Sequence, residues 1–238
     1  MKLLIATPMY GGMCSGEYTR ASLGIIPTLQ PHGVEVAFAY IYNNSLITSA
    51  RDQLAAICLQ HDFTHMMFID ADIKFNAADI LSMLQADKDV IAGVYPKKEI
   101  NWHMVHQKAV AGAKPEELTN FTGSLVVNLV DNEKERVVKA NEPLEVFGAG
   151  TGFMLIKRSV FDRLEPHVEK YIDSNSESEI NSFFFLMKDP ETKKQLSEDY
   201  AFCYLCRQHG IKIHVAPWVR LGHAGTYLFE GSVVPVTQ

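Results

Sequence analysis

The 238-residue sequence has no apolar run close to the roughly 20 residues that a membrane-spanning helix needs. Its opening segment, residues 1–7, is only briefly apolar and stops at Pro8, which is typical of a first strand and not of a signal peptide. Acidic residues outnumber basic residues, 28 to 22. The resulting net charge of −6 argues against broad nonspecific affinity for nucleic acid or an anionic membrane surface. A cytoplasmic location is therefore the default expectation.

Cysteine is also scarce, and Cys14, Cys58, Cys203 and Cys206 do not resemble a disulfide framework in a chain this long. Cys203 and Cys206 have the C-x-x-C spacing, but they lie within a pattern that predicts a helix, and no second pair of ligands is evident. They are better explained as small buried hydrophobic residues than as a zinc or redox site.

Hydrophobic residues, in contrast, make up 47% of the chain, which is enough for a full globular core. Strand and helix patterns alternate through the first half, which predicts βαβ units. No linker or internal repeat is visible, so we expect one α/β domain with a mixed, mostly parallel central sheet flanked by helices. The expected strands are 2–7, 34–42, 65–70 and 90–94, and the expected helices are 17–30, about 46–58 with Ser45 as N-cap, and 77–85.

Two carboxylates, Asp70 and Asp72, directly follow the buried strand at 65–70. In α/β sheets, ligands bind beyond the carboxyl ends of the strands. Paired carboxylates at such a place suit a hard divalent cation that takes further ligands from phosphate oxygens. The competing interpretation is an Asp-rich turn in which Asp72 or Asn76 caps the next helix. The other side chains expected at strand ends are those of Thr7, Tyr42 and Tyr95.

Arg51 occupies an unusual place for a helical arginine. It follows Ala50 on the apolar stripe of the predicted second helix, where a solvated guanidinium is not expected. We predict that Arg51 faces the pocket at the strand ends and pairs with a phosphate or with Asp70.

The second half of the chain is less regular. Residues 97–120 lack clear periodicity and carry several Lys and His residues, so we expect a long loop that is either functional or a solvated insertion. Residues 124–128 and 136–139 have the pattern of a hairpin, and 153–156 and 211–216 have that of strands.

Glycines alternate at positions 148, 150 and 152, just before the apolar run 153–156. The alternation leaves one edge free of side chains, so that a ligand or another backbone can approach closely. The segment is not a P-loop, because the G-K-[ST] ending is absent. It is also not the dinucleotide-binding fingerprint, because that motif is followed by a helix and this segment is followed by a strand.

Acidic residues open the last predicted helix, which starts at Ser197 and ends at Gly210. Glu198 and Asp199 either complement the helix dipole or supply a general base that accepts a proton from a hydroxyl group. His223, which lies between glycines, is either a structural residue or a metal ligand.

Taken in order, these motifs resemble those of the GT-A glycosyltransferases, in particular the compact family-2-like enzymes of bacteria and bacteriophages. The resemblance covers nearly the whole chain and implies a Rossmann-like GT-A domain over 1–238, with a nucleotide-binding half (1–96) and an acceptor and catalytic half (97–238). The matching segments are Ala6-Thr7-Pro8 with Tyr10, Ser45-Leu46-Ile47 with Ala50-Arg51, Asp70-Ala71-Asp72, Gly93-Val94-Tyr95-Pro96, Gly150-Thr151-Gly152-Phe153-Met154, Ser197-Glu198-Asp199 and Gly222-His223.

The resemblance implies a nucleotide-diphosphate sugar as donor. Asp70 and Asp72, with His223 as a further ligand, would bind Mn²⁺ or Mg²⁺, which neutralises the charge on the leaving diphosphate. Asp199, or Glu198 beside it, would deprotonate the acceptor hydroxyl, which implies inversion at the anomeric carbon. The residues implied in donor binding are Thr7, Pro8, Tyr10, Tyr42, Asn43, Arg51, Asp70, Ala71, Asp72, Gly150 and Gly152, of which the last two would line the sugar site.

Two other classes of protein compete with this interpretation. A sugar-phosphate nucleotidyltransferase expects a G-x-G-x-R loop after the first strand, and the segment 8–12 has no basic residue close behind it. A noncatalytic nucleotide-sugar-binding protein would bind the donor without turnover. The acceptor is a glycan, a small molecule or a modified nucleic-acid base; for the last, the Lys and His residues of 97–108 would form the contact surface.

Overall fold

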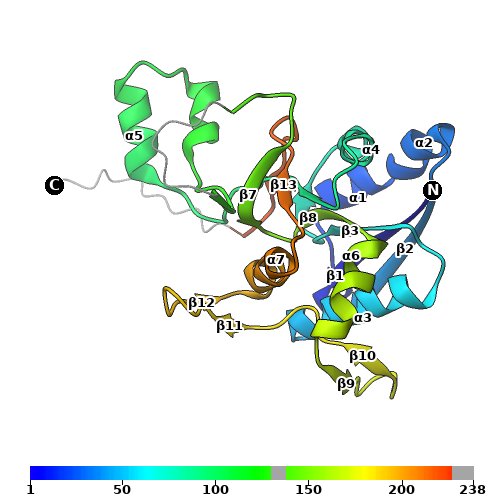
Figure 1. Ribbon diagram of the computed structural model, residues 1–238. Coiled ribbons are helices and arrows are strands. Elements are labelled where there is room, and N and C mark those ends of the chain that lie inside the picture. The colour runs from blue at the N-terminus through cyan, green and yellow to red at the C-terminus, as the bar shows by residue number, and fades with distance from the viewer. Residues whose placement is uncertain (130–137, 227–238) are drawn as a thin grey trace.

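The computed structural model describes residues 1–129 and 138–226 (Figure 1). Its centre is an eight-stranded sheet with the order β2-β1-β3-β8-β5-β13-β7-β6. Within it, β8 and β7 run antiparallel to their neighbours and the other strands share one direction, which confirms the predicted mixed, mostly parallel sheet. The strands are β1 (Lys2–Met9), β2 (Glu35–Tyr42), β3 (His65–Ile69), β5 (Val90–Ala92), β6 (Val127–Leu129), β7 (Leu144–Ala149), β8 (Phe153–Lys157) and β13 (Ile213–Val215).

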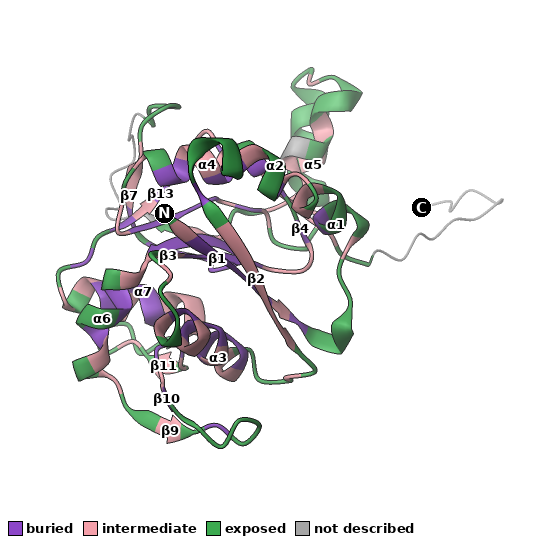
Figure 2. Ribbon diagram, turned by 90° about the vertical axis from the view of Figure 1, so that its right-hand side faces the viewer, coloured by how far each residue is buried: buried purple, intermediate pink, exposed green. Residues whose placement is uncertain are grey.

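Helices cover both faces of this sheet. In Figure 2, α1, α2 and α4 lie above the sheet and α3, α6 and α7 lie below it, whereas α5 stands away from the sheet at the upper left of Figure 1. The helices are α1 (Gly16–Ser22), α2 (Ile25–Leu29), α3 (Ile47–Gln60), α4 (Ala77–Gln85), α5 (Trp102–Val110), α6 (Arg158–Leu164) and α7 (Glu198–Gln208), with 3₁₀ turns η1 (Tyr10–Gly12), η2 (Gln30–His32), η3 (Pro115–Phe121) and η4 (Glu165–His167).

Two hydrophobic cores result from this layering, one on each side of the sheet. In β3, Met66 and Phe68 belong to the core beneath α3 and α6, while Met67 and Ile69 belong to the core beneath α2 and α4. Because both faces are buried, the strand is apolar throughout, and each large side chain contributes about 1.5–3 kcal/mol by leaving water. The apolar residues end at Ile69, so the carboxylates after it emerge at the edge of the sheet.

Short two-stranded antiparallel sheets lie outside the central sheet. The pair that matters for the site is β4 (Ile73–Lys74) with β14 (Gly222–His223), which places His223 opposite Ile73, just after the two carboxylates. The other pairs are β9 (Lys170–Ile172) with β10 (Glu179–Asn181) and β11 (Met187–Lys188) with β12 (Gln195–Leu196).

A buried carboxylate ties α3 to the segment that follows β10. Asp52 is 2% exposed, and its Oδ1 accepts hydrogen bonds from the backbone N–H groups of Phe183 and Phe184, each at 2.9 Å. Its Oδ2 accepts one from the Tyr171 hydroxyl at 3.2 Å. Desolvation outweighs these hydrogen bonds and raises the pKa of Asp52 from 3.8 to about 7.

This raised pKa makes the stability of the fold depend on pH. Between pH 4 and 7 the folded protein binds a proton at Asp52 that the unfolded chain has released, so stability is lost as the pH rises toward 7. We expect the free energy of unfolding to fall by on the order of 2 to 4 kcal/mol from pH 5 to pH 8, and Asp52→Asn to abolish this fall. Urea denaturation across this range measures it, with Asp189→Asn, in an exposed turn, as the control. Equal slopes for wild type and Asp52→Asn would contradict the prediction.

Three sequence-based expectations about helices were wrong. Residues 97–120 contain α5 and η3 and are not a loop; α5 has no buried residue, so no apolar stripe marks it. The expected helix at 17–30 is broken between α1 and α2, where Gly24 and Pro27 disfavour continuity. The helix after β2 has Leu46 as its N-cap residue instead of Ser45, and the Asn44 side chain accepts a hydrogen bond from the Leu46 N–H at 3.0 Å.

Strand expectations were mostly confirmed. β1, β2, β3, β8 and β13 lie where patterns predict them, and the strand expected at 90–94 ends at Ala92. The expected hairpin pairs 124–128 with 136–139, much of which lies outside the described residues; in the described part, β6 pairs with β7.

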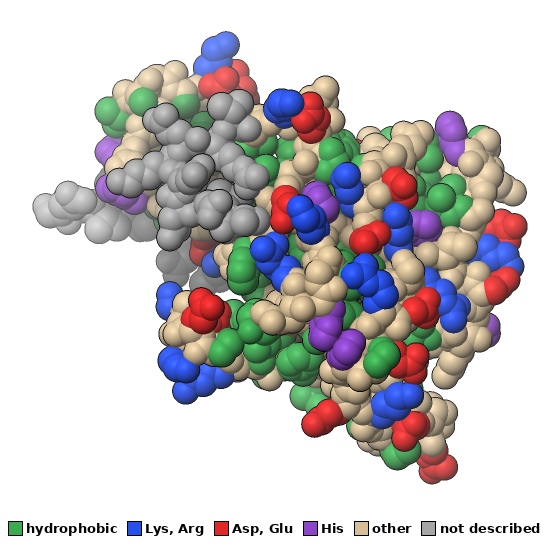
Figure 3. Space-filling model, in the orientation of Figure 1, with side chains coloured by type: hydrophobic (Ala, Val, Ile, Leu, Met, Phe, Trp, Pro, Cys, Tyr) green, Lys and Arg blue, Asp and Glu red, His purple; other side chains and the backbone are tan. Residues whose placement is uncertain are grey.

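The described helices include none long and apolar enough to cross a membrane. On the face shown in Figure 3, basic and acidic side chains are interspersed among the described residues, so this face has no single sign of charge.

Candidate functional site

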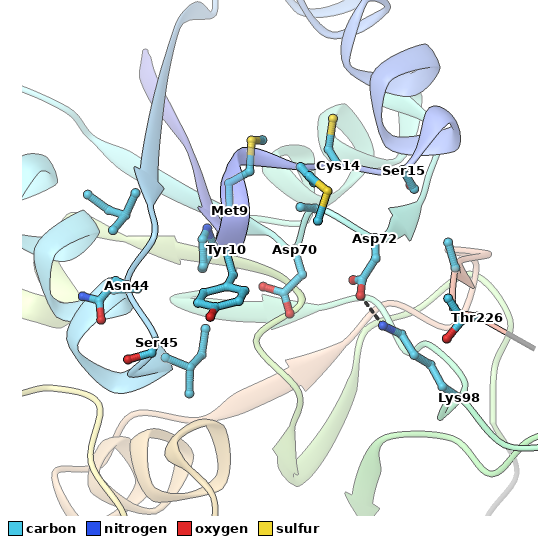
Figure 4. Close-up of a pocket in the computed structure, with 18 residues that line it drawn as sticks. Met9, Tyr10, Cys14, Ser15, Asn44, Ser45, Asp70, Asp72, Lys98 and Thr226 are labelled. Atoms are coloured by element: carbon cyan, nitrogen blue, oxygen red, sulfur yellow. Dashed lines mark hydrogen bonds and ion pairs between the residues drawn. The ribbon is translucent and has the colours of Figure 1, made fainter.

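A pocket of about 690 Å³ opens at the carboxyl ends of β1, β2 and β3 (Figure 4). This is the edge at which the topology of an α/β sheet predicts ligand binding. Its lining residues are Pro8 and Met9 at the end of β1, Tyr10, Met13, Cys14 and Ser15 after it, Ile41 in β2, Asn44, Ser45, Ile47 and Ala50 around the start of α3, Asp70, Ala71 and Asp72 after β3, and Lys98, Ala224, Gly225 and Thr226.

Five residues that the sequence predicts for donor binding line this pocket: Pro8, Tyr10, Asp70, Ala71 and Asp72. Tyr10 is 70% exposed and presents its ring to the pocket in Figure 4. An exposed aromatic ring at this position is suited to stacking against a planar base.

Several other predicted residues lie beside the pocket and do not line it. Thr7 is buried, and its hydroxyl is hydrogen-bonded to the Tyr18 hydroxyl at 2.7 Å. Tyr42 is largely exposed and stacks on Tyr40 with a ring-centroid distance of 6.2 Å. Asn43 adopts a left-handed backbone conformation with φ of 56°. These three residues therefore shape the strand ends through packing and backbone geometry.

Asp72 is surrounded by cationic and hydrogen-bonding groups. Its Oδ2 forms an ion pair with the Lys98 ammonium, and its Oδ1 lies 3.4 Å from His223 Nε2. Its backbone carbonyl accepts a hydrogen bond from the Ala224 N–H at 2.8 Å, which anchors β14 beside it. Desolvation acts to raise the pKa of Asp72, but the hydrogen bonds from His223 and Lys98 outweigh it and lower the pKa to about 2. Asp72 is therefore an anion at every physiological pH.

His223 is held in a defined orientation. Its Nδ1 lies 2.9 Å from the Pro96 carbonyl oxygen, which can only accept, so Nδ1 carries the proton and donates. The Tyr95 ring meets the imidazole edge-on at a centroid distance of 5.3 Å. Nε2 then faces Asp72 Oδ1: it donates to this oxygen when it carries a proton, and without that proton its lone pair can bind a metal. A metal-binding histidine usually donates its other ring N–H to a backbone carbonyl or a carboxylate, which fixes the orientation of the ring.

Arg51 forms the predicted pair with Asp70. Its Nη2 lies 3.1 Å and 3.2 Å from the two Asp70 oxygens, and its Nε lies 3.3 Å from Glu198 Oε1. The Arg51 side chain is only 4% exposed, so it lies behind Asp70 and not in the pocket. Desolvation opposes its charge, but Asp70 and Glu198 raise the pKa of Arg51 overall. Arg51 therefore orients Asp70, and the alternative of pairing with a phosphate does not fit its burial.

The three expected metal ligands are not all brought together. Asp72 and His223 are adjacent, whereas Asp70 is engaged by Arg51. Within residues 1–129 and 138–226, no group of three His, Cys, Asp or Glu residues is arranged to hold a metal ion. A carboxylate and an imidazole are ligand types that suit Mn²⁺, and these two side chains would leave most of its coordination positions to other ligands.

The alternating glycines have a different role from the one expected. A Cβ at Gly150 would lie 2.2 Å from the Tyr95 hydroxyl, and one at Gly152 would lie 2.7 Å from it. The Gly152 N–H donates a hydrogen bond to this hydroxyl at 3.1 Å, and Tyr95 is buried. The glycine edge thus receives the Tyr95 ring, and neither glycine lines the pocket. Gly152 does approach Asp70, whose Oδ2 would lie 3.0 Å from its Cβ.

At the start of α7, the two acidic residues have separate partners. Ser197 is the N-cap residue, as predicted, but its hydroxyl donates to Asp199 Oδ1, which also accepts from the Tyr200 N–H at 2.9 Å. Glu198 faces Arg51 and is 13% exposed. Glu198 is therefore committed to an ion pair, while Asp199 accepts, among the described residues, from the N-cap hydroxyl of Ser197 and the N–H of Tyr200.

The sequence interpretation missed Lys98 and the 224–226 segment as pocket residues. Lys98 belongs to the Lys- and His-bearing stretch at 97–108 that was singled out for its charge, so a signal for it was present. The 224–226 segment carried none, because its place depends on the pairing of β14 with the distant β4.

No family model matches this sequence, and no curated protein matches it. Among solved structures, the chain is similar to A197 from STIV, with a TM-score of 0.49, 17% identity, and coverage of 100% of this chain and 99% of that chain. It is also similar to GalNAc-T7 with UDP, GalNAc and Mn²⁺, with a TM-score of 0.43, 12% identity, and coverage of 94% of this chain and 43% of that chain. A third likeness is to CMP:2-keto-3-deoxy-manno-octonic acid synthetase complexed with CTP, with a TM-score of 0.40, 11% identity, and coverage of 90% of this chain and 89% of that chain. These likenesses are distant, so function has to be argued from the residues of the site.

Proposed function

We propose that this protein is a GT-A-type glycosyltransferase that transfers a sugar from a nucleotide-diphosphate sugar to an acceptor hydroxyl with a divalent metal, Mn²⁺ or Mg²⁺. The observation that carries the proposal is the pairing of Asp72 with His223 at the rim of a pocket that forms at the carboxyl ends of three parallel strands. Residues 1–96 are proposed as the nucleotide-binding half and residues 97–238 as the acceptor and catalytic half.

In this proposal, each residue has one task. Asp72 and His223 Nε2 hold the metal, which when bound neutralises negative charge on the leaving diphosphate. Arg51 holds Asp70 in place at the pocket wall. Tyr10 packs against the nucleotide base, since its exposed ring is at the pocket mouth. Asp199 accepts the proton of the attacking hydroxyl, which leads to inversion by direct displacement.

The pocket composition supports a donor of this class. A cavity of about 690 Å³ is within the range of ligand pockets, and its lining combines two carboxylates with aromatic and aliphatic side chains. A nucleotide sugar offers both kinds of group, a diphosphate for a metal site and an aromatic base for an apolar surface.

Binding of nucleotide sugars with and without Mn²⁺ tests the proposal. We expect at least one nucleotide sugar to raise the Tm by roughly 5–10 °C at about a hundred times its Kd, and only in the presence of Mn²⁺. Asp72→Ala should lose this metal-dependent rise, because it removes the carboxylate ligand. Asp62→Ala should keep it, because Asp62 pairs with Lys2 at the start of β1, at the opposite end of the strand from the pocket.

Two outcomes would contradict the proposal in different ways. An unchanged shift in EDTA would show that the metal has no part in donor binding. Tight donor binding without slow hydrolysis or transfer would indicate a noncatalytic nucleotide-sugar-binding protein.

A further inference from the structure

Lys98 reaches the candidate site from the segment between β5 and α5. Its ammonium pairs with Asp72 Oδ2, 26 residues away in sequence, and Figure 4 shows the pair as a dashed line. The aliphatic stem of Lys98 passes close to Gly225, where a Cβ would lie 3.0 Å from the lysine Cδ. A residue without a side chain at 225 therefore leaves room for Lys98 to lie in this position.

The lysine and a divalent metal need the same carboxylate. Lys98 occupies Oδ2 of Asp72, and His223 Nε2 lies on the side of Oδ1. A metal cation that bridges Asp72 and His223 attracts the carboxylate. The ammonium group at Oδ2 repels this metal cation, because both are positively charged. Metal binding and the Lys98 pair therefore compete.

The Lys98 pair is built to be displaced, unlike the other pair in the site. The Lys98 and Asp72 side chains are 43% and 35% exposed, so water screens their attraction. Arg51, in contrast, is 4% exposed and bridges two carboxylates, so it is fixed. Lysine is a compact charge on a flexible stem, and it binds phosphate as a point charge.

We propose that Lys98 is an exchangeable counter-ion of Asp72. It neutralises Asp72 while the pocket holds no nucleotide, and it moves to the diphosphate when a metal takes its place on the carboxylate. This inference rests on the proposed function and adds a consequence to it: the metal and the diphosphate bind with positive coupling, and Lys98 carries part of that coupling.

Binding of Mn²⁺ alone, followed by electron paramagnetic resonance, tests the first half. Lys98→Met should bind Mn²⁺ about five- to tenfold more tightly than wild type, because the competing charge is gone. Lys98→Arg, which keeps the charge, should bind Mn²⁺ as weakly as wild type. Lys97→Met is the matched control, because it removes the same charge from an exposed neighbour that does not line the pocket.

Binding of inorganic pyrophosphate in the absence of metal, measured by calorimetry, tests the second half. Lys98→Met should bind it about five- to tenfold more weakly than wild type or Lys97→Met. Unchanged pyrophosphate affinity would overturn the transfer of Lys98 to the diphosphate, and unchanged Mn²⁺ affinity would overturn its competition with the metal.

The same titrations separate this inference from the proposed function. Absence of Mn²⁺ binding in all four proteins would overturn the metal site itself, and the role of Lys98 with it. The predicted changes in Mn²⁺ and pyrophosphate affinity, without transfer from any nucleotide sugar, would uphold Lys98 as counter-ion and overturn the glycosyltransferase.

Discussion

Replacing Asp199 by Asn should slow sugar transfer by about a hundred- to ten-thousandfold, the usual cost of losing a positioned general base. Donor affinity should stay close to that of wild type, because Asp199 does not line the pocket. The position of Asp199 in the first turn of α7 supports this role, since it projects from a fixed helix start. Its Oδ1 is held by the Ser197 hydroxyl and the Tyr200 N–H, which orients the carboxylate. Single-turnover transfer, with donor binding measured separately, checks both expectations.

Glu198→Gln provides the matched comparison. Glu198 is engaged by Arg51 Nε, and Gln still offers an oxygen to this donor, so the loss of rate should be much smaller than for Asp199→Asn. Wild-type turnover of Asp199→Asn, or abolition of transfer by Glu198→Gln alone, would show that the general base is the other carboxylate.

The sequence predicted correctly those elements whose burial pattern and ends are marked by residues within the element or next to it. β3 is apolar on both faces because a core lies on each side, and its end is marked by Asp70. The limits of α4 match the expected 77–85, because Asn76 caps the helix and Ile80, Met83 and Leu84 form a buried stripe. The Asn76 side chain accepts a hydrogen bond from the Ala78 N–H at 3.0 Å, so the cap interpretation held for Asn76.

The parts that the sequence did not predict depend on distant contacts or lack burial. β8 lies antiparallel between β3 and β5, a sheet order that no local pattern contains. The alternating glycines predicted that another group lies close to the backbone of this segment. That group is the side chain of Tyr95, 57 residues from Gly152 in the sequence. α5 buries no residue and so leaves no periodic signal, although Asn101 caps it by accepting from the Met104 N–H.

The pairing of Arg51 illustrates both the reach and the limit of sequence reasoning. Its place on the apolar stripe of α3 indicated a buried charge that needs a carboxylate, and Asp70 is that carboxylate. The second partner, Glu198, is 147 residues away and could not be inferred. The guanidinium therefore links the strand end that carries Asp70 to the helix start that carries Asp199.

Arg51→Met should lower the free energy of unfolding by about 3 kcal/mol, because it leaves Asp70 and Glu198 without their shared cation. This value is at the low end for a broken buried ion pair, since Asp70 is 27% exposed and water offsets part of the loss. In a chain of this size the Tm should fall by roughly 6–12 °C. The Arg51 guanidinium also lies over the Phe68 ring at 5.2 Å, a contact that methionine keeps in part. Differential scanning calorimetry measures the change.

Restoring the charge balance in a second variant separates an ion-pair effect from a packing effect. In Arg51→Met/Glu198→Gln, one of the two uncompensated carboxylates is gone, so the double variant should be more stable than Arg51→Met alone. Arg51→Lys keeps the charge but cannot bridge both carboxylates, since an ammonium lacks the planar fork of a guanidinium, so it should fall between wild type and Arg51→Met. If instead the double variant is no more stable than Arg51→Met, the loss comes from packing against Phe68, and Arg51 does not act through the two carboxylates.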